Sequence, residues 1–374
     1  MTSQNIINRK KVVFAINNLG MGGAENMLVE QVKQMDKGQF EIIVMTILPN
    51  KEGNIIDKLP KNITFMELNL TGIFDLRGVY RLSTFLRKEK VDAVITSLFD
   101  ANLLGRVAAI LARVPVIISS ELNVSEDKRY WQIFADWILS LFTKKILVSS
   151  NEVLDFTSEQ EHIPKNKFQL NFNAIPLRLG DVRETRDAVL KKYGLSTEGS
   201  YIVNAGSLTP QKGQKFIIEA VRLMKESGVS NFKVLIFGRG VLKDELTKQI
   251  ESLGLESDVL FMGFASIDDI MAISDIFTLP SLWEGLSIAL LNSMDAGCPI
   301  VATRVSGTNE ALVDGDSALL ITPGSSTEMA KAFTRLLKDK DLRQRLSEGA
   351  KEQVKKFSIE KNVKVIENLI SADE

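Results

Sequence analysis

Short apolar runs alternate with longer amphipathic stretches along almost the whole chain. In the first half, runs rich in β-branched residues predict buried strands at residues 12–17, 41–47, 93–97, 116–120 and 145–149. Apolar residues at helical spacing predict helices between them, at residues 24–35, 76–88, 102–113 and 128–142. This alternation is typical of a parallel sheet covered by helices on both faces.

A polar segment without a strand pattern, residues 179–199, precedes a second series of the same kind. This series predicts strands at residues 201–205, 232–237, 259–262, 276–279, 300–303 and 318–321. It predicts helices at residues 214–225, 242–253, 267–273, 286–296 and 327–337. We therefore expect an α/β protein with two doubly wound, Rossmann-like domains, residues 1–178 and 179–358. Ligands bind such domains at the carboxyl ends of the strands, so we expect the site in a crevice that faces these ends.

Composition excludes several kinds of chemistry. The 374 residues carry 46 basic and 47 acidic side chains, a balance that argues against binding nucleic acid by neutralising many phosphates. The first 180 residues are nevertheless slightly basic and the remainder slightly acidic. The single cysteine, Cys298, and the single histidine, His162 in a predicted loop at 159–164, exclude a disulfide framework, a multi-histidine metal site and a Ser-His-Asp triad. Catalysis would have to use carboxylates, lysines, backbone amides and helix dipoles.

No apolar run reaches the length of about 18 residues that a membrane-spanning helix needs, so we expect a soluble, cytoplasmic protein. Residues 128–145, KRYWQIFADWILSLFTKK, nevertheless combine an aromatic helical face with basic residues at both ends. We expect this aromatic face to be buried in the first domain. The alternative is a helix lying peripherally on the inner face of the membrane, where it would help to hold an acceptor.

Two glycine-rich turns resemble dinucleotide-binding loops only superficially. After the first strand, Gly20, Gly22 and Gly23 are followed by Glu25 where the third glycine of G-x-G-x-x-G should stand. The turn at residues 238–240 fails the same test. Gly22 and Gly23 still open a helix, so a ligand or an anion could approach the free amides there; the alternative is an ordinary tight turn.

The second domain carries stronger signals at two strand ends. Residues 206–213, which begin with Gly206 and Ser207, place Lys212 just before a predicted helix, where its ammonium could meet a diphosphate. A solvated loop lysine is the alternative.

Glu284 follows another predicted strand, and a helix is expected from residue 286. The amides of Gly285, Leu286 and Ser287 would then be free to bind a phosphate, and Asn292 would lie about 12 Å further along the helix. Glu284 could instead merely complement the helix dipole.

These segments, in chain order, resemble family 4 of the retaining, nucleotide-sugar-dependent glycosyltransferases, which have the GT-B fold. The resemblance covers nearly the whole chain. The G-G-A-E turn of the family stands at 22–25. Asn-Ala-Ile at 173–175 is similar to its N-G-I, and residues 206–213 are similar to G-R-L-x-x-x-K-G. Residues 280–303 resemble P-S-x-x-E-G…E-A-M-A-x-G-x-P-V-V-A-T, and residues 307–310 resemble G-G-x-x-E.

The resemblance implies transfer of a sugar from a nucleotide diphosphate, such as a UDP-sugar, to a hydroxyl of a saccharide or lipid-linked saccharide, in cell-surface polysaccharide or glycoconjugate synthesis. Lys212 would hold the leaving diphosphate and Glu284 would contact the donor sugar. Glu310 would support the loop or contact the donor. The first domain would bind the acceptor, with Gly22 and Gly23 on that side, and a last helix at 359–374 would cross back to it. No cofactor or metal is implied, and Asp-Gly-Asp at 314–316 is expected to form a turn.

Four positions depart from the family pattern. Ser207 replaces the usual phosphate-binding arginine, and Asn292 replaces the glutamate that contacts the ribose. Pro176 replaces a common aspartate, and Arg239 stands where an acid is usual. An alternative is therefore a weakly active or inactive transferase-like subunit that binds a partner enzyme or a saccharide. A nucleotide-sugar epimerase is a further alternative, disfavoured by the isolation of His162.

Overall fold

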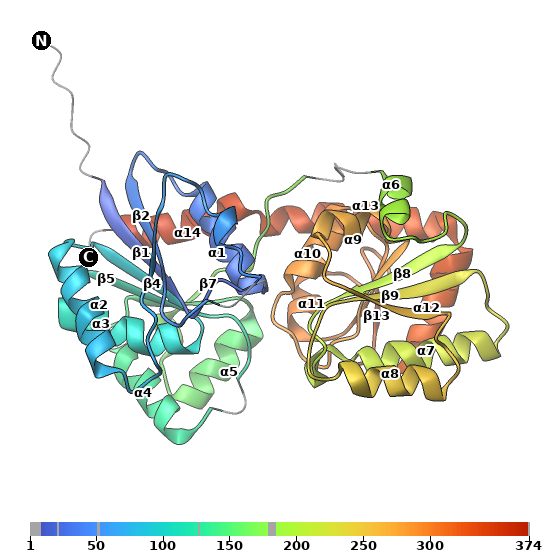
Figure 1. Cartoon of the computed structure of the whole chain (residues 1–374), viewed down its shortest axis with the longest axis horizontal. Helices are drawn as coiled ribbons and strands as arrows, with labels where there is room; N and C mark the ends of the chain where they lie inside the picture. The colour runs from blue at the N-terminus through green and yellow to red at the C-terminus, as the bar shows by residue number, and fades with distance from the viewer. Residues whose placement is uncertain (1–8, 21, 51–52, 126–127, 179–184, 373–374) are drawn as a thin grey trace, which may run out of the picture. The chain divides into compact units, whose positions relative to one another are not determined.

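The computed structural model describes residues 9–20, 22–50, 53–125, 128–178 and 185–372. The chain divides into two compact units, Met1–Pro176 with Ile359–Glu374 (unit 1) and Leu177–Ser358 (unit 2). Each unit contains one parallel sheet flanked by helices (Figure 1). The expected boundary after residue 178 lies two residues from this division, and part of the polar segment expected there, 179–184, lies outside the described residues.

Unit 1 contains a seven-stranded sheet of order β3-β2-β1-β4-β5-β6-β7, in which neighbouring strands are parallel. Its strands are β1 (Lys10–Ile16), β2 (Phe40–Thr46), β3 (Thr64–Glu67), β4 (Ala93–Ser97), β5 (Val116–Glu121), β6 (Lys145–Val148) and β7 (Phe168–Leu170). Strands β1 and β4 pair side by side although they are not consecutive in the chain, and the strand order changes direction between them. Sequence analysis did not predict the short strands β3 and β7.

Helices cover both faces of this sheet. They are α1 (Gly23–Gln34), α2 (Leu76–Lys88), α3 (Arg106–Ala112), α4 (Tyr130–Ser140), α5 (Asn151–Glu161) and α14 (Ile359–Ser371), with a π-helical turn at Ala101–Gly105 and 3-10 turns at Ile56–Lys58 and Lys165–Lys167. Alternate residues of β1 point to opposite faces. Phe14 packs with residues of α1 and α14, whereas Val13 packs with residues of α2 and α3.

The carboxyl-terminal helix α14 belongs to unit 1, which is the placement that the resemblance implies. Its buried positions Val363, Ile366 and Ile370 recur at helical spacing and complete the core beside α1. The side-chain amide of Gln31 donates to Asn362 Oδ1 at 2.8 Å, so a buried polar pair fixes the register of the two helices.

Unit 2 contains a six-stranded sheet of order β10-β9-β8-β11-β12-β13, again parallel. Its strands are β8 (Ser200–Ala205), β9 (Phe232–Phe237), β10 (Val259–Gly263), β11 (Ile276–Leu279), β12 (Ile300–Thr303) and β13 (Leu319–Ile321), and each had been predicted. The helices are α6 (Arg186–Lys192), α7 (Gln214–Glu226), α8 (Lys243–Ser252), α9 (Ile267–Ala272), α10 (Ile288–Asp295), α11 (Ser306–Ala311), α12 (Ser326–Lys338) and α13 (Lys340–Val354). Helices α6, α11 and α13 had not been predicted.

The expectation that the aromatic face of α4 is buried was wrong. Tyr130 and Phe134 are 93% and 62% exposed, and Leu141, just past the helix, is 59% exposed. The residues of α4 that pack inward are Asp136, Leu139 and Ser140. The aromatic side of this helix therefore faces outward, and its one charged residue, Asp136, faces the protein. No helix in the described part of the chain combines the length and the apolarity required to cross a bilayer.

Candidate functional site

The loops that follow two adjacent strands of unit 2 bring Lys212 and Glu284 together. Strand β8 leads into the 3-10 turn Pro210–Lys212, and β11, its neighbour in the sheet, leads into the loop that carries Glu284. The Lys212 ammonium and Glu284 Oε2 are 2.5 Å apart, and the Ser281 hydroxyl donates to the same oxygen at 3.0 Å. Both charged side chains are largely buried, with 16% and 8% exposed.

Backbone contacts fix these two loops against one another. The Leu282 N–H donates to Gln211 O at 2.8 Å, and the Gln211 side-chain amide donates to Trp283 O at 3.0 Å. Gly213 has a φ of +63°, and a Cβ at this position would lie 2.3 Å from Pro280 O. Only glycine fits between the loops, so Gly213 determines how closely Lys212 can approach Glu284.

The loop after Glu284 differs from the expected helix start. Helix α10 begins at Ile288, and the Ser287 hydroxyl caps it by accepting from Leu290 N–H at 3.4 Å. Gly285, Leu286 and Ser287 therefore precede the helix, and the expected start at residue 286 was wrong by two residues. The backbone of α11 closes the other side of this loop, because a Cβ on Gly307 would lie 1.9 Å from Gly285 O. The binding of phosphate by these amides stays a prediction.

Asn292 lies in the second turn of α10 and forms a side-chain hydrogen bond within its own helix. Its side-chain amide donates to Ile288 O at 2.8 Å. The side-chain carbonyl oxygen of Asn292 thus remains to accept a hydrogen bond from a hydroxyl group. Only the segment from Ile288 onward is helical, so Glu284 and Asn292 are not joined by the eight helical residues on which the expected separation of about 12 Å was based.

Gly206 and Ser207 begin the loop after β8. Ser207 is exposed, and its carbonyl accepts from the Gln214 side-chain amide at 3.0 Å. Among the described residues, several buried side-chain oxygens near this edge lack a hydrogen-bond partner: Asn204 Oδ1, Thr209 Oγ1, Gln214 Oε1, Thr278 Oγ1 and Thr308 Oγ1. Buried polar atoms are usually paired. Sequence analysis did not find Thr209, Gln214 or Thr308, because a hydroxyl or an amide in a loop gives no pattern.

The other candidates of unit 2 are Glu310 and Arg239. Glu310 lies in α11 and is partly buried. The Arg239 guanidinium lies over the Phe264 ring, 4.8 Å from its centroid. This cation–π contact accounts for Arg239 without a ligand.

Asp314, the first acid of the Asp-Gly-Asp segment, is held by the protein itself. It pairs with Arg304 at 2.6 Å and accepts from the Leu320 N–H at 2.8 Å. Although partial burial opposes it, these contacts lower the pKa of Asp314. Gly315 adopts a φ of +75°, as a turn requires. In the parts of the chain that the structure describes, no group of three or more His, Cys, Asp or Glu side chains is arranged to hold a metal ion.

Neither the histidine nor the cysteine is placed for nucleophilic or acid–base work. His162 is exposed and ends α5 with a φ of +55°, so residues 159–161 are helical rather than part of the expected loop. Burial raises the pKa of the Cys298 thiol to about 12, so it stays protonated at neutral pH.

In unit 1, the turn with Gly22 and Gly23 opens α1, as expected, while residue 21 lies outside the described residues. Glu25 occupies the position of the missing third glycine, and a Cβ on Gly22 would lie 2.2 Å from Glu25 Oε2. Burial raises the pKa of this carboxyl. A glutamate side chain thus fills the space over the turn.

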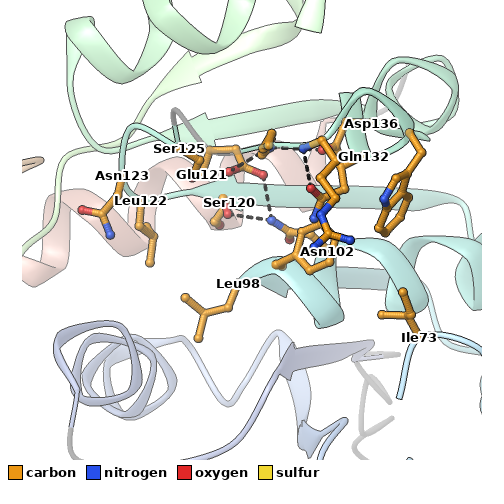
Figure 2. A pocket seen from close by; sticks show the side chains of 14 residues that line it. Ile73, Leu98, Asn102, Ser120, Glu121, Leu122, Asn123, Ser125, Gln132 and Asp136 are labelled. Carbon is orange, nitrogen blue, oxygen red and sulfur yellow. Dashed lines mark hydrogen bonds and ion pairs between the residues drawn. The ribbon is translucent and has the colours of Figure 1, made fainter. Parts of the chain in front are cut away.

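Sequence analysis missed a buried charge cluster in unit 1 beside a cavity of about 500 Å³ (Figure 2). Lys128 contacts three carboxylates, and its side chain is only 8% exposed. These are Glu121 at 3.7 Å, Asp136 at 3.0 Å and Glu161 in a short ion pair. This ammonium therefore does not face anionic lipid, which is what the membrane alternative would have required of it.

The cluster also contains a second cation, Arg106, which is 2% exposed and pairs with Asp136. Burial, partly opposed by Lys128, raises the pKa of Glu121 and raises that of Glu161 to about 7. Three carboxylates thus share two cations, and the excess negative charge favours retention of a proton.

Comparison with known proteins agrees with this architecture. Residues 185–353 match the sequence model of the family described as Glycosyl transferases group 1. Over 371 residues the chain is 25% identical to the UDP-Gal:alpha-D-GlcNAc-diphosphoundecaprenol alpha-1,3-galactosyltransferase of Escherichia coli, and 93% of each chain is covered. Over 366 residues it is 26% identical to the N-acetylgalactosamine-N,N'-diacetylbacillosaminyl-diphospho-undecaprenol 4-alpha-N-acetylgalactosaminyltransferase of Campylobacter jejuni, covering 93% of this chain and 96% of that one.

Among solved structures, the fold is similar to that of the Anabaena protein HepE in complex with UDP, with a TM-score of 0.83 at 19% identity. The match covers 97% of this chain and 100% of that one. The two parallel-sheet units have the GT-B architecture. The residues that match the glycosyl transferases group 1, 185–353, all lie in unit 2, and the relatives that match over nearly the whole chain are glycosyltransferases.

Proposed function

We propose that this glycosyltransferase moves a sugar from a nucleotide diphosphate, a UDP-sugar being the first candidate, to a hydroxyl of a lipid-linked saccharide with retained anomeric configuration. The observation that carries the proposal is the Lys212–Glu284 pair at the ends of adjacent strands in the unit that matches the family. The Escherichia coli and Campylobacter jejuni relatives are named as transferases that act on diphosphoundecaprenol-linked saccharides, which supports this class of acceptor.

The two opposite charges of the pair can contact different parts of the donor, the diphosphate and the sugar. The Lys212 ammonium attracts the diphosphate, which gains negative charge as the bond to the sugar breaks. The Glu284 carboxylate can accept hydrogen bonds from sugar hydroxyls, and Ser281 fixes its orientation. In the free protein the two side chains are largely buried and pair with one another, so neither lacks a partner of opposite charge.

In the proposed reaction, the acceptor oxygen forms a bond to the anomeric carbon on the face from which the diphosphate departs. The electron pair of the breaking bond goes to the phosphate oxygen, and that oxygen takes the proton of the acceptor hydroxyl. No histidine is needed in this scheme, in keeping with the exposed position of His162 at the end of α5.

We further propose that the reaction needs no divalent cation. Lys212 and the amides around Gly285 would supply the positive charge that a metal supplies elsewhere. Turnover in excess EDTA should equal that in buffer containing Mg²⁺ or Mn²⁺. Loss of activity in EDTA, restored by added metal, would contradict this part of the proposal.

The outward aromatic face of α4 favours the peripheral-membrane alternative. Phe134, Trp137 and Leu141 are exposed on it, and aromatic side chains favour the headgroup boundary. Since Lys128 is buried in the charge cluster, we propose that apolar insertion contributes more than attraction to anionic lipid.

The test of the function is a screen of nucleotide sugars with the purified protein, measuring nucleoside diphosphate release with and without a lipid extract of the cell envelope. Release that depends on one donor and on the extract supports the transferase. The alternative of an inactive subunit predicts no release and, by calorimetry, no binding of any nucleoside diphosphate. The intact Lys212–Glu284 pair argues against that alternative.

A further inference from the structure

The cavity of unit 1 has walls of two kinds. It is lined by polar side chains of the charge cluster, among them Glu121, Asn102 and Asp136, and also by the aromatic rings of Phe99 and Trp131. Figure 2 shows Asn102, Glu121 and Asp136 beside one another at the cavity. Its volume, about 500 Å³, falls within the range of about 300–1,000 Å³ that is usual for small-molecule sites.

The two carboxylate oxygens of Glu121 have different partners. It is the last residue of β5, and its Oε1 accepts from the Asn102 side-chain amide at 2.9 Å. Its Oε2 lies 3.7 Å from Lys128 Nζ, beyond ordinary hydrogen-bond distance. This oxygen therefore retains capacity to accept a hydrogen bond.

The rest of the network holds this arrangement rigid. The Asn102 carbonyl oxygen Oδ1 accepts from the Thr96 hydroxyl at 2.7 Å, and its amide also donates to Ser120 O at 3.0 Å. Asn102 is only 3% exposed. With each of its polar atoms engaged, it cannot rotate away from Glu121 without breaking several hydrogen bonds.

The aromatic wall is likewise fixed. The Trp131 ring meets the Phe99 ring edge to face, with centroids 6.1 Å apart and planes at 74°. Trp131 is still 43% exposed, so part of its ring is available to a ligand. Aromatic rings pack against the apolar C–H face of a pyranose, and carboxylates accept from its hydroxyls.

The charge of the cluster selects against a phosphate in the same place. Arg106 and Lys128 are already engaged by the three carboxylates, so neither offers a free cation to an anion. A neutral polyhydroxylated ligand can donate hydrogen bonds to the Glu121 carboxylate without adding negative charge to the cluster.

We infer that this cavity binds a neutral sugar ring, with Glu121 accepting from its hydroxyls and Trp131 packing against its face. The identification of this ring as the sugar of the acceptor rests on the proposed function. The binding of a sugar does not, because it follows from the cavity alone.

The test is saturation-transfer NMR of the full chain with methyl glycosides of glucose, galactose, N-acetylglucosamine and N-acetylgalactosamine at about 10 mM, in the range expected for small, weakly bound ligands. The variants are Trp131→Ala and Glu121→Gln. Trp137→Ala is the matched control, since Trp137 lies on the same helix, is 41% exposed and does not line the cavity. Thermal unfolding and titration with UDP are measured on each variant.

We expect at least one glycoside to bind the wild type and the Trp137→Ala variant equally, with Kd raised roughly fivefold or more by Trp131→Ala and by Glu121→Gln. Unchanged unfolding temperatures and UDP affinities would show that the effect is local. Absence of binding by every glycoside, or equal binding by all variants, overturns the inference. A failed donor screen with intact glycoside binding would instead overturn the proposed function alone.

Discussion

Lys212 and Glu284 lie 72 residues apart in the chain and form an ion pair with 2.5 Å between Nζ and Oε2. Their loops follow neighbouring strands, β8 and β11, whose carboxyl ends lie at the same edge of the sheet. The pairing thus follows from the topology of the sheet, and its tightness follows from the glycines that let the loops approach.

Gly213→Ala should lower activity by displacing Lys212, an effect that can be distinguished from the cost of backbone strain. The new Cβ would lie 2.3 Å from Pro280 O, so the loop must shift and carry Lys212 with it. We expect kcat/KM to fall about tenfold or more, measured by nucleoside diphosphate release. The matched control is Gly194→Ala, which has a similar φ of +66° but no atom within 4 Å of the added carbon. Both variants should lose about 1 kcal/mol of stability from the left-handed conformation, and equal activity of the two would refute this account of Gly213.

Asn292→Glu should strengthen donor binding. The substitution gives up the hydrogen bond from Nδ2 to Ile288 O but offers a carboxylate, which accepts hydrogen bonds from hydroxyls more strongly than an amide carbonyl does. We expect the Kd for UDP, measured by calorimetry, to fall severalfold. An unchanged or weaker Kd would show that Asn292 does not reach the ribose.

Glu161 should make the stability of unit 1 depend on pH. Burial raises the pKa of its carboxyl from 4.5 to about 7, with Lys128 opposing the shift. Between these values the folded state holds more protons than the unfolded chain, so the free energy of unfolding falls as pH rises through this window. In Glu161→Gln this contribution is absent, so the decrease in the free energy of unfolding between pH 5 and pH 8 should be smaller by up to about 3 kcal/mol.

The control for Glu161 is Glu159→Gln, an exposed glutamate on the same helix. Thermal unfolding of the three proteins is followed from pH 5 to pH 8. The Glu159 variant should lose stability with pH as the wild type does, whereas the Glu161 variant should lose less. A slope in Glu161→Gln equal to that of the wild type would show that Glu161 does not titrate in this range.

The outward face of α4 should mediate membrane binding. We expect the wild type to float with vesicles containing phosphatidylglycerol, and Trp137→Ser and Phe134→Ser each to weaken binding severalfold because less apolar area inserts. Val241→Ser removes an apolar side chain of unit 2 that is 85% exposed and should have no effect. If the wild type does not float, the proposed membrane contact is wrong.

The strands could be predicted from the sequence far better than the cluster that surrounds the cavity. In unit 2 each strand is a nearly continuous apolar run, which marks it clearly, whereas β3 and β7 of unit 1 are short and mostly half-exposed. Helix α13 was missed because its sequence, KDLRQRLSEGAKEQV, is mostly polar with few buried positions.

The orientation of α4 shows a different limit. Periodicity identifies which residues share a face, but it does not say toward which side that face points. Asp136 points inward because it forms ion pairs with Arg106 and Lys128, and both partners lie on other segments of the chain. The sequence likewise placed Lys212 and Glu284 at strand ends, while the start of α10 depended on a single capping hydroxyl, that of Ser287.

The most direct measurement of the central claim is kcat/KM for sugar transfer by Lys212→Ala and Glu284→Ala, with the donor and acceptor identified by the screen. Each variant should lose at least about a hundredfold, the scale of losing one preorganised charged contact to the transition state. Lys215→Ala, which removes an exposed lysine at the start of the next helix, should retain wild-type activity. Sugar transfer at the wild-type rate by both Lys212→Ala and Glu284→Ala would contradict the account.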